Sequence, residues 1–119
     1  MAKLVNLTSH DVVIANDAGA EILRIPPSGI IARIDVRQDV IGHVESDGVT
    51  IPVVATVFGE LTGLPEPEQD VVYIASTLVA QRAAQLGRKD VVSPDTGPTA
   101  VRDDAGRIVA VRRFQAFWA

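Results

Sequence analysis

The sequence predicts a single α+β domain over residues 1–119: a small, mainly antiparallel sheet or partial barrel of short strands with one helix at about 77–86. Three observations predict it. β-Branched residues are abundant, three turn signals each separate two apolar runs, and only one stretch has helical periodicity. The length of 119 residues, with 47% hydrophobic and 22% charged side chains, fits one globular domain with its own core.

The turn signals predict three antiparallel hairpins. Each loop combines Asp, which can start a turn through its side chain, with Gly, which can close it. The loops lie at 16–19, 46–48 and 103–106. The flanking strands are expected at 12–15 and 20–25, at 40–44 and 49–51, and at 99–102 and 107–111. Three hairpins in one domain favour antiparallel pairing.

Between these hairpins the chain predicts further strands and a loop. Residues 30–37 alternate between apolar and polar side chains, as in a half-buried strand with one polar face. Pro52 interrupts the apolar run 49–58 and predicts an edge strand or a bulge, because proline cannot donate to a ladder. Residues 59–70 are acidic and predict a solvated surface loop, with a basic partner as the alternative.

The apolar run 71–75 predicts a central strand that leads directly into the helix. Ser76 or Thr77 can cap the helix, and Gly87 can end it. A short strand is expected to follow at 91–92.

Composition narrows the function classes. The net charge of −4 lacks the basic surplus of a general nucleic-acid binder, so nucleic acid is not expected as a partner. The absence of cysteine excludes disulfides and thiolate metal sites. The start of the chain has too short an apolar run for a signal peptide, and no apolar run approaches the roughly 20 residues that span a bilayer. We therefore expect a cytoplasmic protein without a membrane partner.

Two motifs suggest chemistry that their context does not support. Asp95, Thr96 and Gly97 match the triplet of dimeric aspartic proteases, but they lie between two prolines and late in the chain, which indicates a turn. His10 and His43 lack tight ligand spacing, so no metal site is predicted. No nucleophile, base and orienting group can be assembled from spacing, so we expect no enzyme, no catalytic residue and no cofactor.

The junction between the central strand and the helix is the candidate small-ligand site. A helix N-terminus presents free N–H groups, and Ser76 and Thr77 add hydroxyl donors. Arg102, Arg107 or Arg112 would complete a phosphate pocket if they lay nearby. The alternative is that the serine only caps the helix, since the chain has no glycine-rich phosphate loop.

The C-terminal segment is the candidate partner-binding surface. It combines arginine with aromatic side chains, the residue types enriched at interface hot spots. Its members are Arg112, Arg113, Phe114, Phe117 and Trp118. Two other interpretations stay open: the aromatic side chains cover an aromatic-poor core, or they stack on nucleic acid.

Six segments in order along the chain carry a resemblance to a known family. They are 6–10, 26–29, 64–67, 73–80, 94–98 and 102–108. In these segments the chain resembles small proteins of actinobacterial phages and prophages that have no known activity. Two features differ, because the family commonly has proline where this chain has Ser9 and does not share the aromatic ending. The resemblance implies a phage-encoded accessory protein in a bacterial host cytoplasm, and it carries over no catalytic residue.

The expected function is therefore a phage-encoded accessory protein that acts by non-enzymatic interaction with a host protein. One alternative is a small-ligand binding protein for a nucleotide or a defence signal. Another is a minor virion or assembly component, which would form an ordered homo-oligomer.

Overall fold

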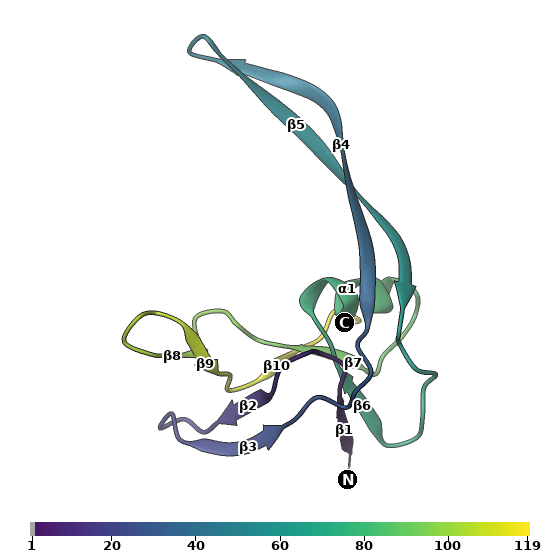
Figure 1. The fold of residues 1–119 in the computed structure, drawn as a ribbon, viewed down its shortest axis with the longest axis vertical. Helices are drawn as coiled ribbons and strands as arrows, with labels where there is room; N and C mark the ends of the chain where they lie inside the picture. The colour runs from purple at the N-terminus through teal and green to yellow at the C-terminus, as the bar shows by residue number, and fades with distance from the viewer. Residues whose placement is uncertain (1) are drawn as a thin grey trace.

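The computed structural model describes residues 2–119 and has the predicted α+β architecture, with strands and one short helix. Figure 1 shows a body, which holds the helix and most strands, and a long hairpin that projects from it. The Cα radius of gyration is 17.4 Å, whereas a compact domain of this length has about 13.5 Å. The projecting hairpin accounts for this difference. Among the described residues no sheet closes into a barrel, and no helix is long and apolar enough to cross a membrane.

The central sheet of the body has four strands in the order β1-β6-β7-β10. Their bounds are β1 Lys3–Asn6, β6 Val71–Ile74, β7 Val91–Pro94 and β10 Phe114–Gln115. The sheet is mixed: β1, β6 and β7 run parallel, and β10 is antiparallel to β7. The predicted central strand, β6, does lie in the interior of this sheet. Parallel neighbours need a crossover connection, and the helix supplies it between β6 and β7.

The helix α1 (Thr77–Gln85) begins and ends where the sequence predicts. Ser76 is the N-cap, and its hydroxyl accepts a hydrogen bond from the Val79 amide at 3.4 Å. Val79, Ala80 and Ala83 are buried on one face, because positions three and four apart lie on the same side of a helix. The helix therefore packs on the sheet through small and β-branched side chains.

Two apolar clusters cover opposite faces of the central sheet. Tyr73 and Ala75 join the cluster under the helix, whereas Ile74 and Val92 join a second cluster. This division follows from the alternation of side chains along a strand. The second cluster is covered by the predicted hairpin of β2 (Val12–Ala15) and β3 (Glu21–Ile25). The hairpin of β8 (Val101–Arg102) and β9 (Ile108–Ala110) also forms as predicted.

The acidic loop at residues 63–70, which follows β5 (Val49–Thr62), is fastened to the body at two points. Arg88 donates from Nη2 to the Pro65 carbonyl, and Tyr73 donates from its hydroxyl to the Glu66 carbonyl, each at 3.0 Å. Arg88 is held in turn by both carboxylate oxygens of Asp90 at 2.9 Å. The loop is thus at the surface, as predicted, and its path is set by these contacts. Residues 59–62, which the prediction placed in the loop, belong instead to β5, whose end pairs with the start of β4 (Arg33–Ser46).

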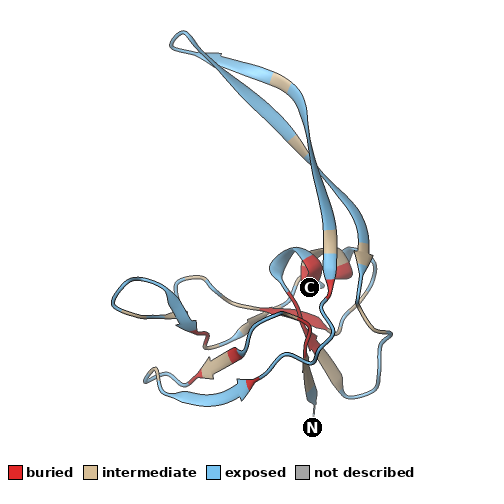
Figure 2. Ribbon diagram, viewed as in Figure 1, coloured by how far each residue is buried: buried red, intermediate tan, exposed pale blue. Residues whose placement is uncertain are grey.

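The projecting hairpin consists of β4 (Arg33–Ser46) and β5 (Val49–Thr62), and we call it the arm. The sequence suggested separate strands at 30–37 and 40–44, whereas the structure has one continuous strand of 14 residues. The predicted half-burial holds only at the base: Ala32 is buried, but Val36 is already 44% exposed. Figure 2 shows the arm almost wholly exposed and the buried residues concentrated in the body.

Candidate functional site

The arm exposes large apolar side chains along most of its length. A scattered exposed Leu or Val is ordinary, but a continuous apolar surface on a monomer marks a contact site. Ile41 is 67% exposed and Val40 is 61% exposed. The full set of exposed large apolar residues on the arm is Val36, Val40, Ile41, Val44, Val49, Ile51, Val53, Val54, Val57 and Phe58.

Four members of this set, together with the partly buried Ala55, form a continuous row on one face, which we call the apolar stripe. It consists of alternate residues of β5, which point to the same side of the ribbon. Its members are Val49, Ile51, Val53, Ala55 and Val57. Val44 of β4 lies opposite Ile51 in the register and widens the stripe near the tip.

The arm also has two open backbone edges. Among the described residues β4 and β5 pair only with each other. A lone two-stranded hairpin is at best marginally stable in water, and an unpaired edge is a template for another strand. The edges differ, because Pro52 removes an amide donor from β5, whereas β4 contains no proline. The prediction of an edge strand or bulge at Pro52 is confirmed.

The middle of β4 carries an ion pair at the surface. Nε of Arg37 lies 3.1 Å and 3.2 Å from the two carboxylate oxygens of Asp39. The two side chains share a face because they are two residues apart on a strand. Both are well exposed, so the pair adds little to the stability of a single chain and remains open to other partners.

A cavity of about 400 Å³ lies in the body, at the carboxyl ends of β6 and β7 beside the start of α1. Ligands of α/β sheets commonly bind at this end of parallel strands. Ser76 and Thr77, the predicted ligand-binding pair, both line it. The other lining residues are Thr8, His10, Asp11, Val12, Val13, Ala75, Pro94, Thr96, Ile108, Val109, Ala110 and Val111.

The predicted arginine partners lie outside the lining of this cavity. Arg102 donates from Nη1 to the Gly106 carbonyl at 2.7 Å, within its own hairpin. Arg107 pairs with Asp103 at 3.3 Å, also within that hairpin. Arg112 donates to the carbonyls of Asn16 and Thr99 at 3.1 Å and 2.6 Å. The structure therefore brings Ser76 and Thr77 to a cavity without a basic group from this set.

The C-terminal segment lies against the body rather than apart from it. Phe114 packs on the second apolar cluster, and Phe117 packs on the cluster under the helix. Trp118 is 37% exposed, and Arg113 is exposed and paired with Asp95. The guanidinium of Arg113 and the Gly97 amide hold the pKa of the Asp95 carboxyl below its ordinary value. Of the predicted partner-binding residues, Arg113 and Trp118 are thus the most accessible.

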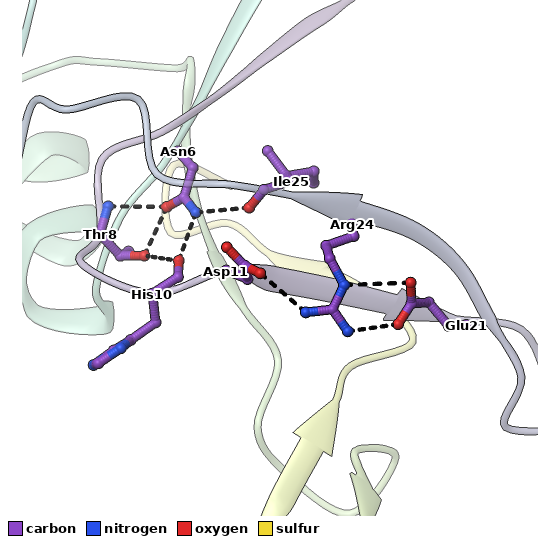
Figure 3. Close-up of polar contacts among 7 residues, drawn as sticks. All are labelled: Asn6, Thr8, His10, Asp11, Glu21, Arg24 and Ile25. Carbon is purple, nitrogen blue, oxygen red and sulfur yellow. Dashed lines mark hydrogen bonds and ion pairs between the residues drawn. The ribbon is translucent and has the colours of Figure 1, made fainter.

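A buried asparagine near the cavity has a role that the sequence did not reveal (Figure 3). Asn6 donates from Nδ2 to the carbonyls of His10 at 2.7 Å and Ile25 at 3.0 Å. Its Oδ1 accepts from the amide and the hydroxyl of Thr8 at 2.9 Å and 2.6 Å. These four bonds use the full capacity of the amide. They fix the loop between β1 and β2, which places His10 and Asp11 at the cavity.

The negative charge of Asp11 at the rim of the cavity is neutralised by a neighbouring arginine. Asp11 accepts from Nη1 of Arg24 at 2.9 Å, and Arg24 also binds Glu21 (Figure 3). The hydrogen bond from Arg24 holds the pKa of Glu21 below its ordinary value. Within residues 2–119 no three His, Cys, Asp or Glu side chains are grouped to hold a metal ion.

Comparison with known proteins does not extend this picture. No family model matches the chain, and neither a curated protein nor a solved structure is significantly similar to it. The function is therefore argued from the arm and the cavity.

Proposed function

We propose that this chain is a non-enzymatic interaction protein that binds a partner protein through the arm. The observation that carries the proposal is the exposure of ten large apolar side chains on a ribbon with no covering layer. Complete burial of one such side chain contributes on the order of 1.5–3 kcal/mol. Even partial burial of the set would therefore supply a substantial driving force for association.

The open edge of β4 adds a second source of affinity. A strand that joins an exposed edge gains main-chain hydrogen bonds, and its alternate side chains meet those of the edge strand. The arm thus offers both an apolar face and a hydrogen-bonding edge to a partner. We place the main interaction there rather than on the C-terminal segment, whose two phenylalanines pack on the body.

The resemblance of the sequence to phage proteins supports a more specific form of this proposal. In that form the chain is a phage-encoded accessory protein that acts in the host cytoplasm on a host protein. The arm is equally suited to the alternative of an assembly component, because a second copy of the chain would present the same apolar surface.

The proposal is tested by reducing the apolar character of the arm while keeping its strand propensity. Val44→Thr, Ile51→Thr and Val53→Thr combined should abolish partner capture and assembly, since threonine is β-branched but polar. The body should retain its near-UV circular dichroism. The matched control is Arg113→Ala with Trp118→Ala, which removes the accessible part of the C-terminal segment. If the control loses the partner and the arm variant keeps it, the interaction lies on the C-terminal segment and the proposal is wrong.

A second candidate function is small-ligand binding, which the cavity beside Ser76 and Thr77 favours. Binding to the folded state would raise the free energy of unfolding by about 2.7 kcal/mol at a ligand concentration 100 times Kd. A panel of nucleotides, read as melting temperature, tests this directly. The shift should disappear in Thr77→Val, and an unchanged melting temperature across the panel would rule out this candidate for nucleotides.

A further inference from the structure

We infer that the arm binds a second copy of this chain, with the two β4 strands paired antiparallel about a two-fold axis through Gln38. The inference rests on the proposed function, because it names the partner of the surface described there. It would create a four-stranded sheet in the order β5-β4-β4-β5. Three or more strands are what an isolated ribbon needs for independent stability.

Only one edge of the arm is free of proline. β5 is interrupted by Pro52, whereas β4 is free of proline over its whole length. The register between β4 and β5 is regular over 36–40 and shifts on either side of it, between Ile34 and Val36 and between Val40 and Gly42. Gln38 is the centre of this regular segment. A two-fold axis there pairs a regular strand with a regular strand.

The charges in the middle of β4 are self-complementary. With the axis at Gln38, Arg37 lies opposite the second copy's Asp39, and the same pair recurs on the other side of the axis. Arg37 and Asp39 already share a face, because Nε of Arg37 lies 3.1 Å from Oδ1 of Asp39 within one chain. Both side chains can therefore turn to the opposite strand without changing face. Opposite charges directly across a sheet are stabilising, and like charges are destabilising.

Charge also discriminates between neighbouring registers. An axis through Arg37 would place that arginine opposite itself, and an axis through Asp39 would place two carboxylates opposite each other. Of these three axes, only the one at Gln38 gives opposite charges across both strands. An axis at Val36 would also oppose Arg37 and Asp35, but it lies at the register shift that ends the regular segment. The axis at Gln38 also places Val36, 44% exposed, opposite the second copy's Val40, 61% exposed.

The position of Gln38 in β4 allows a long overlap between the two arms. Since β4 runs from Arg33 to Ser46, an axis at Gln38 lies near its midpoint and the two arms overlap along most of their length. Each tip then reaches the base of the other arm, where Ile30 and Ile31 are exposed. The apolar stripes remain on one face of the combined sheet.

The chain offers a direct test because it contains no cysteine. A residue on the axis faces its own copy, with Cα atoms about 4.5–5.5 Å apart in an antiparallel pair, which is within the range for a disulfide. Gln38→Cys should therefore form a covalent dimer on mild oxidation. Thr56→Cys is the matched control, because Thr56 lies opposite Gln38 in the register but on β5, away from the axis. Cross-linking of both variants alike, or of neither, would overturn the inferred register.

A charge exchange tests the same register without covalent chemistry. Arg37→Asp and Asp39→Arg should each raise the dimer dissociation constant more than about tenfold, because each places like charges opposite each other twice. Mixing the two variants should restore a one-to-one heterodimer, since one strand then carries two carboxylates and the other two guanidinium groups. Native mass spectrometry distinguishes the mixed species from either parent. Unchanged self-association of either single variant would contradict the axis at Gln38.

Failure of this inference is distinguishable from failure of the proposed function. Wild-type protein that stays monomeric in sedimentation at its highest soluble concentration would overturn the second copy as partner. The wild-type protein could instead bind a different protein through the arm. If the threonine variants of the arm lose that protein, the proposed function stands without self-association. If the arm variants change neither assembly nor partner binding, both are wrong.

Discussion

The body and the arm use the same kinds of side chain and bury them to opposite extents. Ile74 of β6 is completely buried, whereas Ile41 of β4 is 67% exposed. In the body, the helix covers one face of the sheet and the β2–β3 hairpin covers the other. In the arm, Ile34 and Leu61 pack against the cluster under the helix at the base, and beyond the base the two strands have only each other. An apolar strand thus stabilises the fold in one region and remains available for contact in the other.

This contrast shows what distinguishes a core strand from a contact strand. Both are rich in valine and isoleucine, and in both the side chains point alternately to the two faces of the sheet. The difference comes from tertiary neighbours. β6 pairs with β1 and β7 and is covered by the helix and the β2–β3 hairpin, whereas the outer arm has no such neighbours. Substitutions matched by residue type in the two regions therefore separate stability from association.

The largest expected effect comes from the two isoleucines. Ile74→Ala should lower the free energy of unfolding by about 2–5 kcal/mol, since it leaves a cavity in the core. Ile41→Ala should change the free energy of unfolding of the monomer by less than about 0.5 kcal/mol. Chemical denaturation of dilute protein, followed by the fluorescence of Trp118, measures both. Equal losses would show that the arm is packed against something within the single chain.

A second pair of substitutions compares the base of the arm with its tip. Gly63 and Gly48 both have positive φ, 79° and 78°. A Cβ on Gly63 would collide with the carbonyl oxygen of Ile31, whereas one on Gly48 meets nothing within 4 Å. Gly63→Ala should therefore cost more than about 2 kcal/mol of stability, and Gly48→Ala about 1 kcal/mol.

The measurement for this pair is again the midpoint of denaturation, with the arm's amide signals in NMR as a local probe. Gly63→Ala should shift signals at the junction of arm and body, and Gly48→Ala only those of the tip. Equal costs would mean that the arm leaves the body without a fixed junction.

Asn6 tests how firmly the body holds the edge of its cavity. Asn6→Ala should cost about 1–3 kcal/mol, because it leaves the carbonyls of His10 and Ile25 without their donor. Asn6→Asp is the sharper variant, since a carboxylate keeps the size but cannot donate. It should lower the melting temperature at neutral pH at least as much as alanine does. A neutral effect of both variants would show that water replaces the amide.

Local chemistry explains which parts of the fold the sequence predicted. The hairpin loops and the helix cap depend on residues within a few positions of each other, such as Asp103 with Gly106 and Ser76 with Val79. The mixed order of the central sheet was not predictable, because it depends on pairing between β1 and β6, some 68 positions apart (Lys3 with Val71). The length of the arm was not predictable either, because local patterns gave separate strands at 30–37 and 40–44, and only the pairing with β5 shows that one strand runs through both.

The candidate sites show the same limit. Ser76 and Thr77 could be placed at a helix start from sequence, and they line the cavity. The partners of Arg102 and Arg107 lie within their own hairpin, where turn geometry rather than a ligand orients them. Exposure of the arm carries no local signal, because alternating apolar residues predict the same strand whether or not a layer covers it.

The smallest expected effect concerns a charge pair that ties the C-terminal segment to the body. Arg113 and the Gly97 amide lower the pKa of Asp95 from its ordinary value of 3.8. A carboxyl whose pKa is depressed by folding contributes stability above its unfolded-state pKa and loses that contribution as the pH falls through its folded-state pKa. Arg113→Ala should raise the pKa of Asp95 toward the ordinary value and flatten the acid limb of the stability curve, whereas Arg82→Ala should change neither. Carboxyl ¹³C shifts measured against pH report the pKa directly, and because the pair lies in the body, self-association through the arm should be the same in both variants. A change in association with Arg113→Ala would place the C-terminal segment in the interface and weaken the division between body and arm.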